Sequence, residues 1–214
     1  MIKAVVLLSG RGSNFKALLE ADLPVRFTAA ISNRPDAPGL EHARRHGIPA
    51  VALDHKAYPS REAFDQVLAA RIDEAGAELV ILAGYMRILT KAFVERYQGR
   101  LINIHPSLLP AFPGLNTHVE ALAQGVKIHG CTVHFVTPRL DHGPIIIQAA
   151  VPVLPDDTPD RLAARVLAEE HRIYPLAVRW FAQNRLVISD GVVNVRGEEA
   201  SQAVCSDSFK SVLK

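Results

Sequence analysis

Continuous apolar runs, bounded by glycine or polar residues, are the sequence feature that most constrains the fold of this chain. Residues 2–8 are rich in valine and leucine, and residues 79–83 form a second run of the same kind. A strand buried on both faces has this composition, whereas a strand with one wet face alternates apolar and polar residues. Such strands are typical of parallel sheets covered by helices. The runs therefore predict an α/β protein with a buried, largely parallel sheet.

Helical patterns separate these strands, as the connections of a parallel sheet require. Ser60 precedes a helix with apolar residues at helical spacing, and Thr158 precedes the longest expected helix. In the second half, we expect residues 128–137 and 144–153 to pair antiparallel and residues 186–195 to form a hairpin. The sequence thus predicts a single-domain, Rossmann-like open twisted sheet. Its N-terminal half is parallel, its C-terminal half is mixed, and helices lie on both faces.

Length and composition are those of an ordinary globular protein. The chain has 214 residues, of which 49% are hydrophobic and 21% are charged, enough for a well-packed core. Its 24 basic and 22 acidic residues leave a net charge of +2, which is too balanced for an electrostatic nucleic-acid binder. No apolar run reaches the length of a membrane span. The two cysteines, Cys131 and Cys205, form no cluster, so we expect a reducing, cytoplasmic location.

The domain organisation is expected to be simple. Residues 1–196 are predicted to form one domain, and residues 197–214, which are polar and rich in small side chains, a weakly ordered tail. Neither the composition nor the patterning decides between a monomer and a homodimer. Nucleic acids and membranes are not expected among the partners.

A polar pair ends the strand that is expected to begin at Leu101. Side chains alternate along a strand, so Asn103 and His105 lie on the same face, and Pro106 ends the strand because it has no N–H. Ligands of open α/β sheets bind beyond the carboxyl ends of strands. An amide that donates to an oxyanion beside an imidazole that holds a proton suits acyl transfer. The same pair is also common as loop solvation, so the residues alone leave both interpretations open.

A glycine-bearing turn, residues 9–14 (SGRGSN), joins the first strand to a short helix expected over residues 15–21. This order aims backbone N–H groups and the positive end of a helix at a phosphate. The spacing is not the dinucleotide fingerprint, because position 15 is Phe15, and the Gly-Lys-Ser/Thr of a P-loop is absent. From the pattern alone, a phosphate-binding loop and a simple tight turn are equally good interpretations.

Three separated segments together resemble the folate-dependent formyltransferases. They are Asn103–Pro110 (NIHPSLLP) followed by Gly114, Leu140–Pro144 (LDHGP), and the SGRGSN turn, which is similar to the phosphoribosylglycinamide formyltransferase branch. Three motifs in the same order are more specific than any one of them. The resemblance implies transfer of a formyl group from 10-formyltetrahydrofolate, a co-substrate, to the amine of glycinamide ribonucleotide in purine synthesis.

The resemblance implies direct attack through a tetrahedral intermediate. Asn103 and a protonated His105 would donate hydrogen bonds to the oxyanion, and Asp141 would favour the imidazolium through its charge. His134 is implied to lie near the active site as a secondary residue. No covalent enzyme intermediate is needed, since the substrate amine is the nucleophile. We expect no metal, because the two cysteines are isolated and make no cluster of ligands.

The two substrates are implied to use separate sets of residues. The phosphate of the ribonucleotide would bind Gly12, Ser13 and Asn14, and Glu170 would contact its ribose or glycinamide part. The apolar run at residues 86–89 would be costly to expose unless another group covers it. A flat heteroaromatic ring binds well between apolar walls that carry a few polar groups. The residues implied to bind folate are Arg61, Met86, Arg87, Ile88, Leu89 and Asn103.

Two positions depart from the family pattern. Relatives often carry histidine where this chain has Asn116, just before a helix that is expected to begin with the capping box Thr117–Glu120. They tend to carry a polar or basic residue where this chain has Leu167. We therefore expect one loop contact to differ and one substrate contact to be missing or replaced.

Three other functions fit parts of the sequence. A methionyl-tRNA formyltransferase shares the Asn-x-His and Ser-Leu-Leu-Pro features but is expected to need a further C-terminal domain and a basic surface. A formyltetrahydrofolate hydrolase is expected to carry a regulatory domain before its first strand, which here starts at Ile2. A non-catalytic folate- or nucleotide-binding module would keep Gly12 and its neighbours yet need neither Asn103 nor Asp141.

Overall fold

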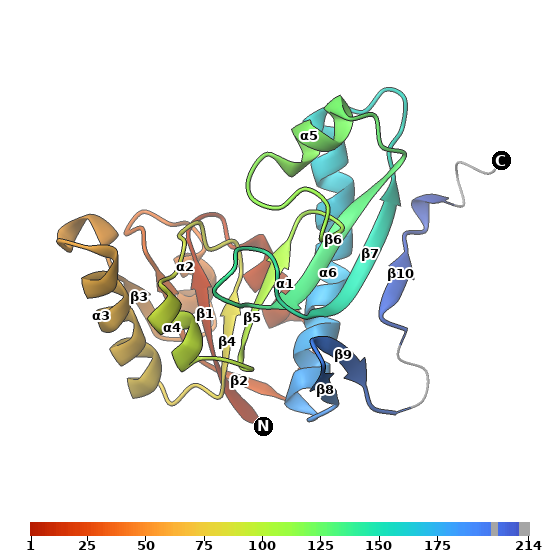
Figure 1. Cartoon of the computed structure of the whole chain (residues 1–214). Helices are drawn as coiled ribbons and strands as arrows, with labels where there is room; N and C mark the ends of the chain where they lie inside the picture. Colours follow the sequence, from red (N-terminus) through yellow and green to blue (C-terminus); the bar gives the residue numbers. More distant parts are fainter. Residues whose placement is uncertain (198–200, 210–214) are drawn as a thin grey trace. The chain divides into compact units, whose positions relative to one another are not determined.

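The computed structural model describes residues 1–197 and 201–209 (Figure 1). Contacts divide the chain into two compact units. Unit 1 contains residues 1–103 and 135–138, and unit 2 contains residues 104–134 and the described residues from 139 onward. The crossing points lie within two strands, since β5 (Leu101–His105) and β6 (Ile128–Phe135) each contribute residues to both units.

Unit 1 is built on parallel strands. They pair in the order β5, β4 (Leu79–Leu82), β1 (Ile2–Leu8), β2 (Val25–Ser32) and β3 (Ala50–Ala52). Every residue from Ala4 to Leu8 is buried. Both faces of β1 are therefore covered, as its continuous apolar run predicts.

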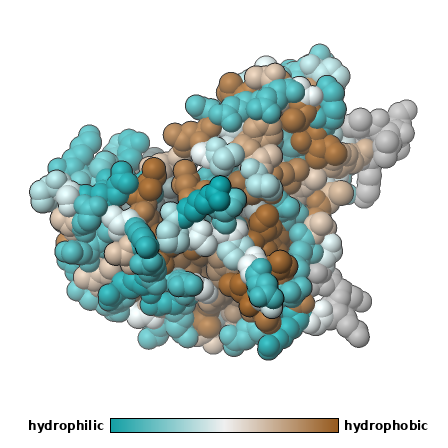
Figure 2. Space-filling view, in the orientation of Figure 1, coloured by the Kyte–Doolittle hydropathy of each residue, from teal (hydrophilic) through white to brown (hydrophobic). Residues whose placement is uncertain are grey.

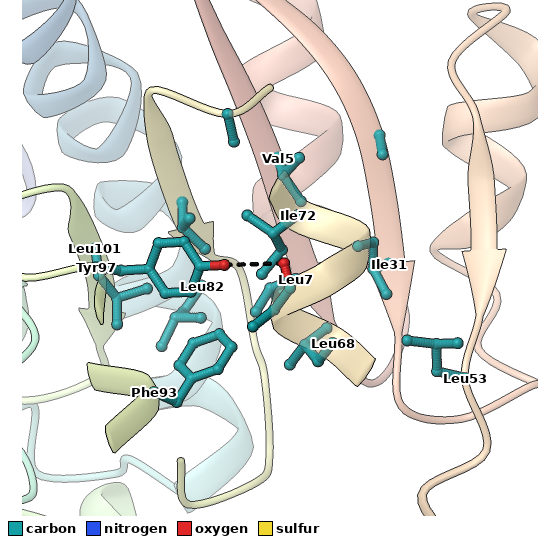
Figure 3. Close-up of a cluster of buried hydrophobic side chains, with 14 of the residues drawn as sticks. Val5, Leu7, Ile31, Leu53, Leu68, Ile72, Leu82, Phe93, Tyr97 and Leu101 are labelled. Carbon is teal, nitrogen blue, oxygen red and sulfur yellow. Dashed lines mark hydrogen bonds between the residues drawn. The ribbon is translucent and has the colours of Figure 1, made fainter. Parts of the chain in front are cut away.

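Helices cover each face of the unit 1 sheet. One face carries α3 (Arg61–Glu74) and α4 (Lys91–Arg96), whose side chains form a buried hydrophobic cluster with β1, β2, β4 and β5 (Figure 3). Tyr97, within this cluster, donates a hydrogen bond from its hydroxyl to Ala69 O at 3.1 Å. The other face carries α1 (Ser13–Glu20), where Phe15 meets Phe27 edge-on at 5.8 Å. The remaining helices of the unit are α2 (Leu40–Arg45) and η1 (His55–Ala57).

Unit 2 is built on a mixed sheet. Strand β6 pairs antiparallel with β7 (Ile145–Pro152), and β10 (Ala203–Cys205) pairs parallel with the other edge of β7. Beside β6 and β7 runs the long helix α6 (Pro159–Ala182) (Figure 1). The unit also contains α5 (Thr117–Ala123) and the hairpin of β8 (Leu186–Ser189) and β9 (Val192–Val195).

The predicted fold class is confirmed. The sheet is parallel in unit 1 and mixed in unit 2, and helices cover both faces of the unit 1 sheet. Ser60 caps α3 by accepting a hydrogen bond from Ala63 N at 3.1 Å, and Thr158 caps α6 by accepting one from Arg161 N at 3.3 Å. The expected antiparallel pair and hairpin are also present. The domain boundary at residue 196 stays a prediction.

The C-terminal segment differs from the expected tail. Residues 203–205 form β10, and Gln202 Nε2 donates hydrogen bonds to Ile146 O at 2.8 Å and to Val193 O at 3.0 Å. The sequence hides this strand, because its apolar run, Ala203–Cys205, is too short to show a strand pattern. Residues 198–200 and 210–214 of the expected tail lie outside the described residues.

Candidate active site

His105 and Asp141 lie together in unit 2. His105 Nδ1 is 3.5 Å from Asp141 Oδ2, and the two side chains are only 6% and 8% exposed. On the other side of the ring, His105 Nε2 lies 2.9 Å from Phe112 O. A carbonyl oxygen only accepts, so Nε2 carries a proton. Each ring nitrogen thus faces an oxygen acceptor, which is the surrounding that a doubly donating imidazolium requires.

Asp141 is the point at which three segments of unit 2 meet. Its Oδ2 accepts a hydrogen bond from Gly114 N at 2.8 Å, and its Oδ1 lies 3.9 Å from His134 Nε2. Asp141 has φ 49, in the left-handed region that few residues other than glycine, asparagine and aspartate adopt. The carboxylate therefore joins the loop after β5, the end of β6 and its own loop around His105.

The start of α5 differs from the predicted capping box. The N-cap is Asn116 at φ 61, and it makes no side-chain cap hydrogen bond. Thr117 Oγ1 instead donates to Pro106 O at 2.8 Å. The hydroxyl that the pattern assigns to capping thus ties the start of α5 to the residue after β5.

The glycine-bearing turn in unit 1 leads directly into α1. Gly12 has φ 72, and a Cβ there would lie 2.8 Å from Gly39 Cα. Only glycine therefore fits position 12 without strain. Lys16 N donates a hydrogen bond to Gly12 O at 2.9 Å. The helix α1 therefore begins at Ser13, and Asn14 is its second residue. The turn places the three predicted phosphate ligands at the positive end of a helix.

The predicted folate residues of unit 1 lie on two elements. Arg61 is the exposed first residue of α3. Residues 86–89 lie in the loop between β4 and α4, where Met86 is 64% exposed and Ile88 is 55% exposed. Apolar patches of this kind, drawn in brown, lie among hydrophilic residues on the face shown in Figure 2.

The remaining predicted residues lie on β5, β6 and α6. Asn103 precedes His105 by two residues on β5, so the strand itself sets their spacing. His134 is buried on β6, and Glu170 is buried on α6, one turn after the half-buried Leu167. The structure thus brings His105, Asp141 and His134 together within unit 2.

Over residues 1–197 and 201–209, no group of three or more His, Cys, Asp or Glu side chains is arranged to hold a metal ion. Cys131 and Cys205 are both free thiols. In the described part of the chain, no helix has the length and apolar character needed to cross a membrane.

Comparison with known proteins shows the family. Residues 2–178 match the family model described as formyl transferase. The chain belongs to the formyl transferase family. Phosphoribosylglycinamide formyltransferase of Escherichia coli (strain K12) is 49% identical to it over 198 residues, which cover 91% of this chain and 93% of that protein. The Haemophilus influenzae protein of the same name is 39% identical over 202 residues, covering 92% and 95%.

Solved structures agree with this formyl transferase assignment. Glycinamide ribonucleotide transformylase 1 from Symbiobacterium toebii has a TM-score of 0.89 and 54% identity, and the match covers 91% of this chain and 94% of that one. Phosphoribosylglycinamide formyltransferase from Coxiella burnetii, solved with CHES, has a TM-score of 0.89 and 46% identity, covering 95% and 98%. The predicted family membership is confirmed.

In this formyl transferase, a polar ladder that the sequence patterns did not predict holds the loop after β5. Thr132 Oγ1 donates to Ser107 O at 2.7 Å and accepts from Leu109 N at 3.0 Å. Gln148 Nε2 donates to Leu109 O at 2.8 Å and to Thr132 Oγ1 at 2.9 Å. Thr132 and Gln148 are directly opposite in the register of β6 and β7. Two polar residues within apolar strands, placed opposite by the predicted pairing, are the signal that could have found them.

A second missed pair lies behind His105. His118 Nδ1 is 3.2 Å from His129 Nε2, and His129 is 1% exposed. Burial, and next the neighbouring His118, lowers the pKa of His129 to about 4. His129 also meets the ring of Phe112 edge-on at 5.7 Å. His129 therefore packs in its neutral form against Phe112, whose carbonyl oxygen accepts a hydrogen bond from His105.

Proposed function

We propose that this formyl transferase moves the formyl group of 10-formyltetrahydrofolate to the primary amine of glycinamide ribonucleotide, a step of purine biosynthesis. The observation that carries the proposal is the buried contact of His105 with Asp141 at 3.5 Å. It occurs in a chain that is 49% identical to a phosphoribosylglycinamide formyltransferase along nearly all of both lengths.

In the proposed reaction, the amine attacks the formyl carbon and creates a tetrahedral intermediate with a negative oxygen. Asn103 donates one hydrogen bond to that oxygen, and the protonated ring of His105 donates another. Asp141 holds the ring and favours its charged form. The proton of the attacking nitrogen passes through water, with the help of Asp141, to the folate nitrogen that leaves. The carbon–nitrogen bond to folate then breaks, which yields tetrahydrofolate and the formylated amine.

The local structure supports the proposed substrate contacts. The α1 end at Gly12, Ser13 and Asn14 takes the phosphate, since backbone N–H groups and the helix dipole favour an anion there. The buried Glu170 takes the ribose or glycinamide part. For the folate, the exposed side chains of Met86 and Ile88 offer apolar walls to a flat ring. Arg61, Arg87, Leu89 and Asn103 complete the proposed set.

The test is a steady-state assay with purified protein, glycinamide ribonucleotide and a 10-formyl folate, followed by release of the deformylated folate. We expect turnover that requires the amine and falls about 10²–10³-fold in Asn103→Ala, because an oxyanion donor is lost. Asn194→Ala, which changes an exposed asparagine of β9, is the matched control and keeps wild-type turnover.

The same assay separates the competing functions. Folate release without the amine identifies a hydrolase, and turnover only with methionyl-tRNA identifies the tRNA enzyme. Bound folate without release identifies a non-catalytic module. Each of these results overturns the proposal. A metal-free reaction, a cytoplasmic location and a monomeric or homodimeric state stay predictions.

A further inference from the structure

The loop that joins β4 to α4, residues 84–90, is fastened to the rest of unit 1 at its start. Ser9 Oγ accepts a hydrogen bond from Met86 N at 2.8 Å, and Ser9 N donates to Gly84 O at 3.1 Å. Ser9 Oγ in turn donates to Asn33 Oδ1 at 2.5 Å. The serine that follows β1 therefore fixes the backbone of the first part of the loop.

Asp65, a residue of α3, fastens the same loop at its end. Asp65 Oδ2 accepts a hydrogen bond from Thr90 N at 2.7 Å, and Asp65 is only 3% exposed. A carboxylate makes a stronger, charge-assisted hydrogen bond than a neutral acceptor. Thr90 is also the N-cap of α4, where its Oγ1 accepts from Phe93 N at 3.3 Å. Asp65 therefore fixes the residue at which the loop ends and α4 begins.

A buried polar cluster lies between these two ends. The Arg87 guanidinium lies over the ring of Phe64, 4.5 Å from its centroid, and Phe64 precedes Asp65 on α3. Burial, and next the charge of Asp65, raises the pKa of the Tyr85 hydroxyl. Asp65 Oδ1, Tyr85 OH and Arg87 Nε are buried, and none has a hydrogen-bond partner among the residues that the structure describes. The inner side of the loop thus contains the polar groups of Asp65, Tyr85 and Arg87.

The outer side of the loop has the opposite character. Met86 and Ile88 are exposed, whereas Tyr85, Arg87 and Leu89 are half-buried. Apolar side chains that are held exposed mark binding surfaces. We propose that Asp65 is a positioning residue for the folate: it fixes the loop so that Met86 and Ile88 face the co-substrate, which Asp65 itself does not touch. This inference rests on the proposed function.

Asp73 supplies a matched control on the same helix. It also joins α3 to α4, since its carboxylate pairs with Arg96 and accepts a hydrogen bond from Tyr97 OH at 3.0 Å. Arg96 is the last residue of α4, whereas Thr90 precedes the first. Asp73→Ala therefore weakens the contact between the two helices but leaves the hydrogen bond of Thr90 N in place.

The experiment measures kcat and the KM values of both substrates for wild type, Asp65→Ala, Asp65→Asn and Asp73→Ala. Tetrahydrofolate binding is measured in parallel by calorimetry. We expect Asp65→Ala to raise the KM for the formyl folate and the Kd for tetrahydrofolate about tenfold, because a charge-assisted hydrogen bond is lost. The KM for the ribonucleotide stays unchanged. Asp65→Asn recovers most of the folate affinity, since its amide oxygen still accepts from Thr90 N.

The inference is overturned if Asp65→Ala raises both KM values alike, or if Asp73→Ala raises the folate KM as much. If wild type lacks amine-dependent turnover, the proposed function fails instead, so the two failures are distinguishable. Should Asp65→Ala not fold, Thr90→Pro and Thr90→Ala decide the question. Thr90 has φ −68, which proline adopts while it removes the N–H donor, whereas alanine removes only the capping hydroxyl. A higher folate KM in Thr90→Pro than in Thr90→Ala supports the inference, and equal values overturn it.

Discussion

The loop of residues 84–90 follows β4, and the loop of residues 106–116 follows β5, the next strand along the chain. The two loops are built in opposite ways. Loop 84–90 covers buried polar atoms of its own Arg87 and of Asp65 on α3, and its outer side exposes Met86 and Ile88. Loop 106–116 surrounds a titratable pair, His105 and Asp141, and places it among backbone acceptors and donors. The first arrangement suits recognition by shape, and the second suits proton chemistry.

The fastening of the two loops follows the same division. Ser9, which follows β1, and Asp65 of α3 each hold the backbone of loop 84–90 through one side-chain hydrogen bond. Loop 106–116 is held by the ladder of Thr132 and Gln148, which makes several hydrogen bonds at once. We therefore expect changes in loop 84–90 to alter folate affinity, and changes around loop 106–116 to alter kcat, stability and pH dependence.

The largest effect is expected for Asp141→Asn. The amide keeps an acceptor for Gly114 N but loses the negative charge beside His105, so kcat falls about 10²–10³-fold, as for a lost transition-state contact. The folate KM changes little. Asp190→Asn is the matched control, because Asp190 also has a left-handed φ, of 51, but lies in the exposed turn between β8 and β9. An unchanged kcat in Asp141→Asn would show that the charge of Asp141 beside His105 does not assist proton transfer.

A smaller but still large effect is expected for Thr132→Val. The change removes the hydroxyl that serves Ser107 O and Leu109 N, and it leaves those buried groups unpaired. The free energy of unfolding should fall by about 2–3 kcal/mol. Urea unfolding measures this, with Thr28→Val as control, since Thr28 makes one long hydrogen bond of 3.3 Å to Ala4 O. Equal losses of unfolding free energy in Thr132→Val and Thr28→Val would contradict a stabilising role of the ladder.

Acid should lower the stability of the region around loop 106–116 through His129. The pKa of His129 is lowered from 6.5 to about 4 by burial, then by His118 and His105. Folding therefore favours its neutral form. The stability from this group is complete above about pH 6.5 and is lost as the pH falls toward about 4. Urea unfolding in this range should show a loss of about 1–2 kcal/mol after allowance for solvent screening.

The control for this acid effect is a pair of glutamine variants. His129→Gln should flatten the pH dependence, whereas His46→Gln, which changes an exposed histidine of unit 1, should leave it as in wild type. A pH dependence that persists in His129→Gln would show that other groups carry it.

The smallest effect is expected for Met86→Ala, which trims the outer side of loop 84–90. The folate KM should rise about three- to fivefold, because part of an apolar contact area is lost, while kcat and the unfolding free energy stay constant. Val192→Ala serves as control, since Val192 is 60% exposed and Met86 is 64% exposed. A fall in kcat without a change in KM would place Met86 in the chemistry and end the contrast between the loops.

Local patterns in the sequence predicted much of the fold and part of the candidate site. Alternation along β5 and the proline after it predicted that Asn103 and His105 share a face. The glycine turn predicted a helix over residues 15–21, and α1 begins two residues earlier, at Ser13. The position of Asp141 beside His105 came only from the family resemblance, because no local pattern relates a loop residue to a strand end that lies far away in the chain.

The features that were missed depend on tertiary register. The ladder of Thr132 and Gln148 exists only because β6 and β7 pair with those residues opposite, and each residue alone is unremarkable in a strand. The capping box at Thr117 was wrong because Pro106 O competes for the same hydroxyl. Strand β10 was missed because its three residues, Ala203–Cys205, are too few to show the alternation or the apolar run of a strand.

Strand β5 contributes Asn103 to unit 1 and His105 to unit 2. Two steps along an extended strand advance about 6.6 Å, and that length changes little while the strand conformation is kept. The spacing of Asn103 and His105 is therefore set along this one strand. Substitutions around either substrate would leave this spacing unchanged. A single residue inserted between Asn103 and His105 would instead turn their side chains to opposite faces of the strand.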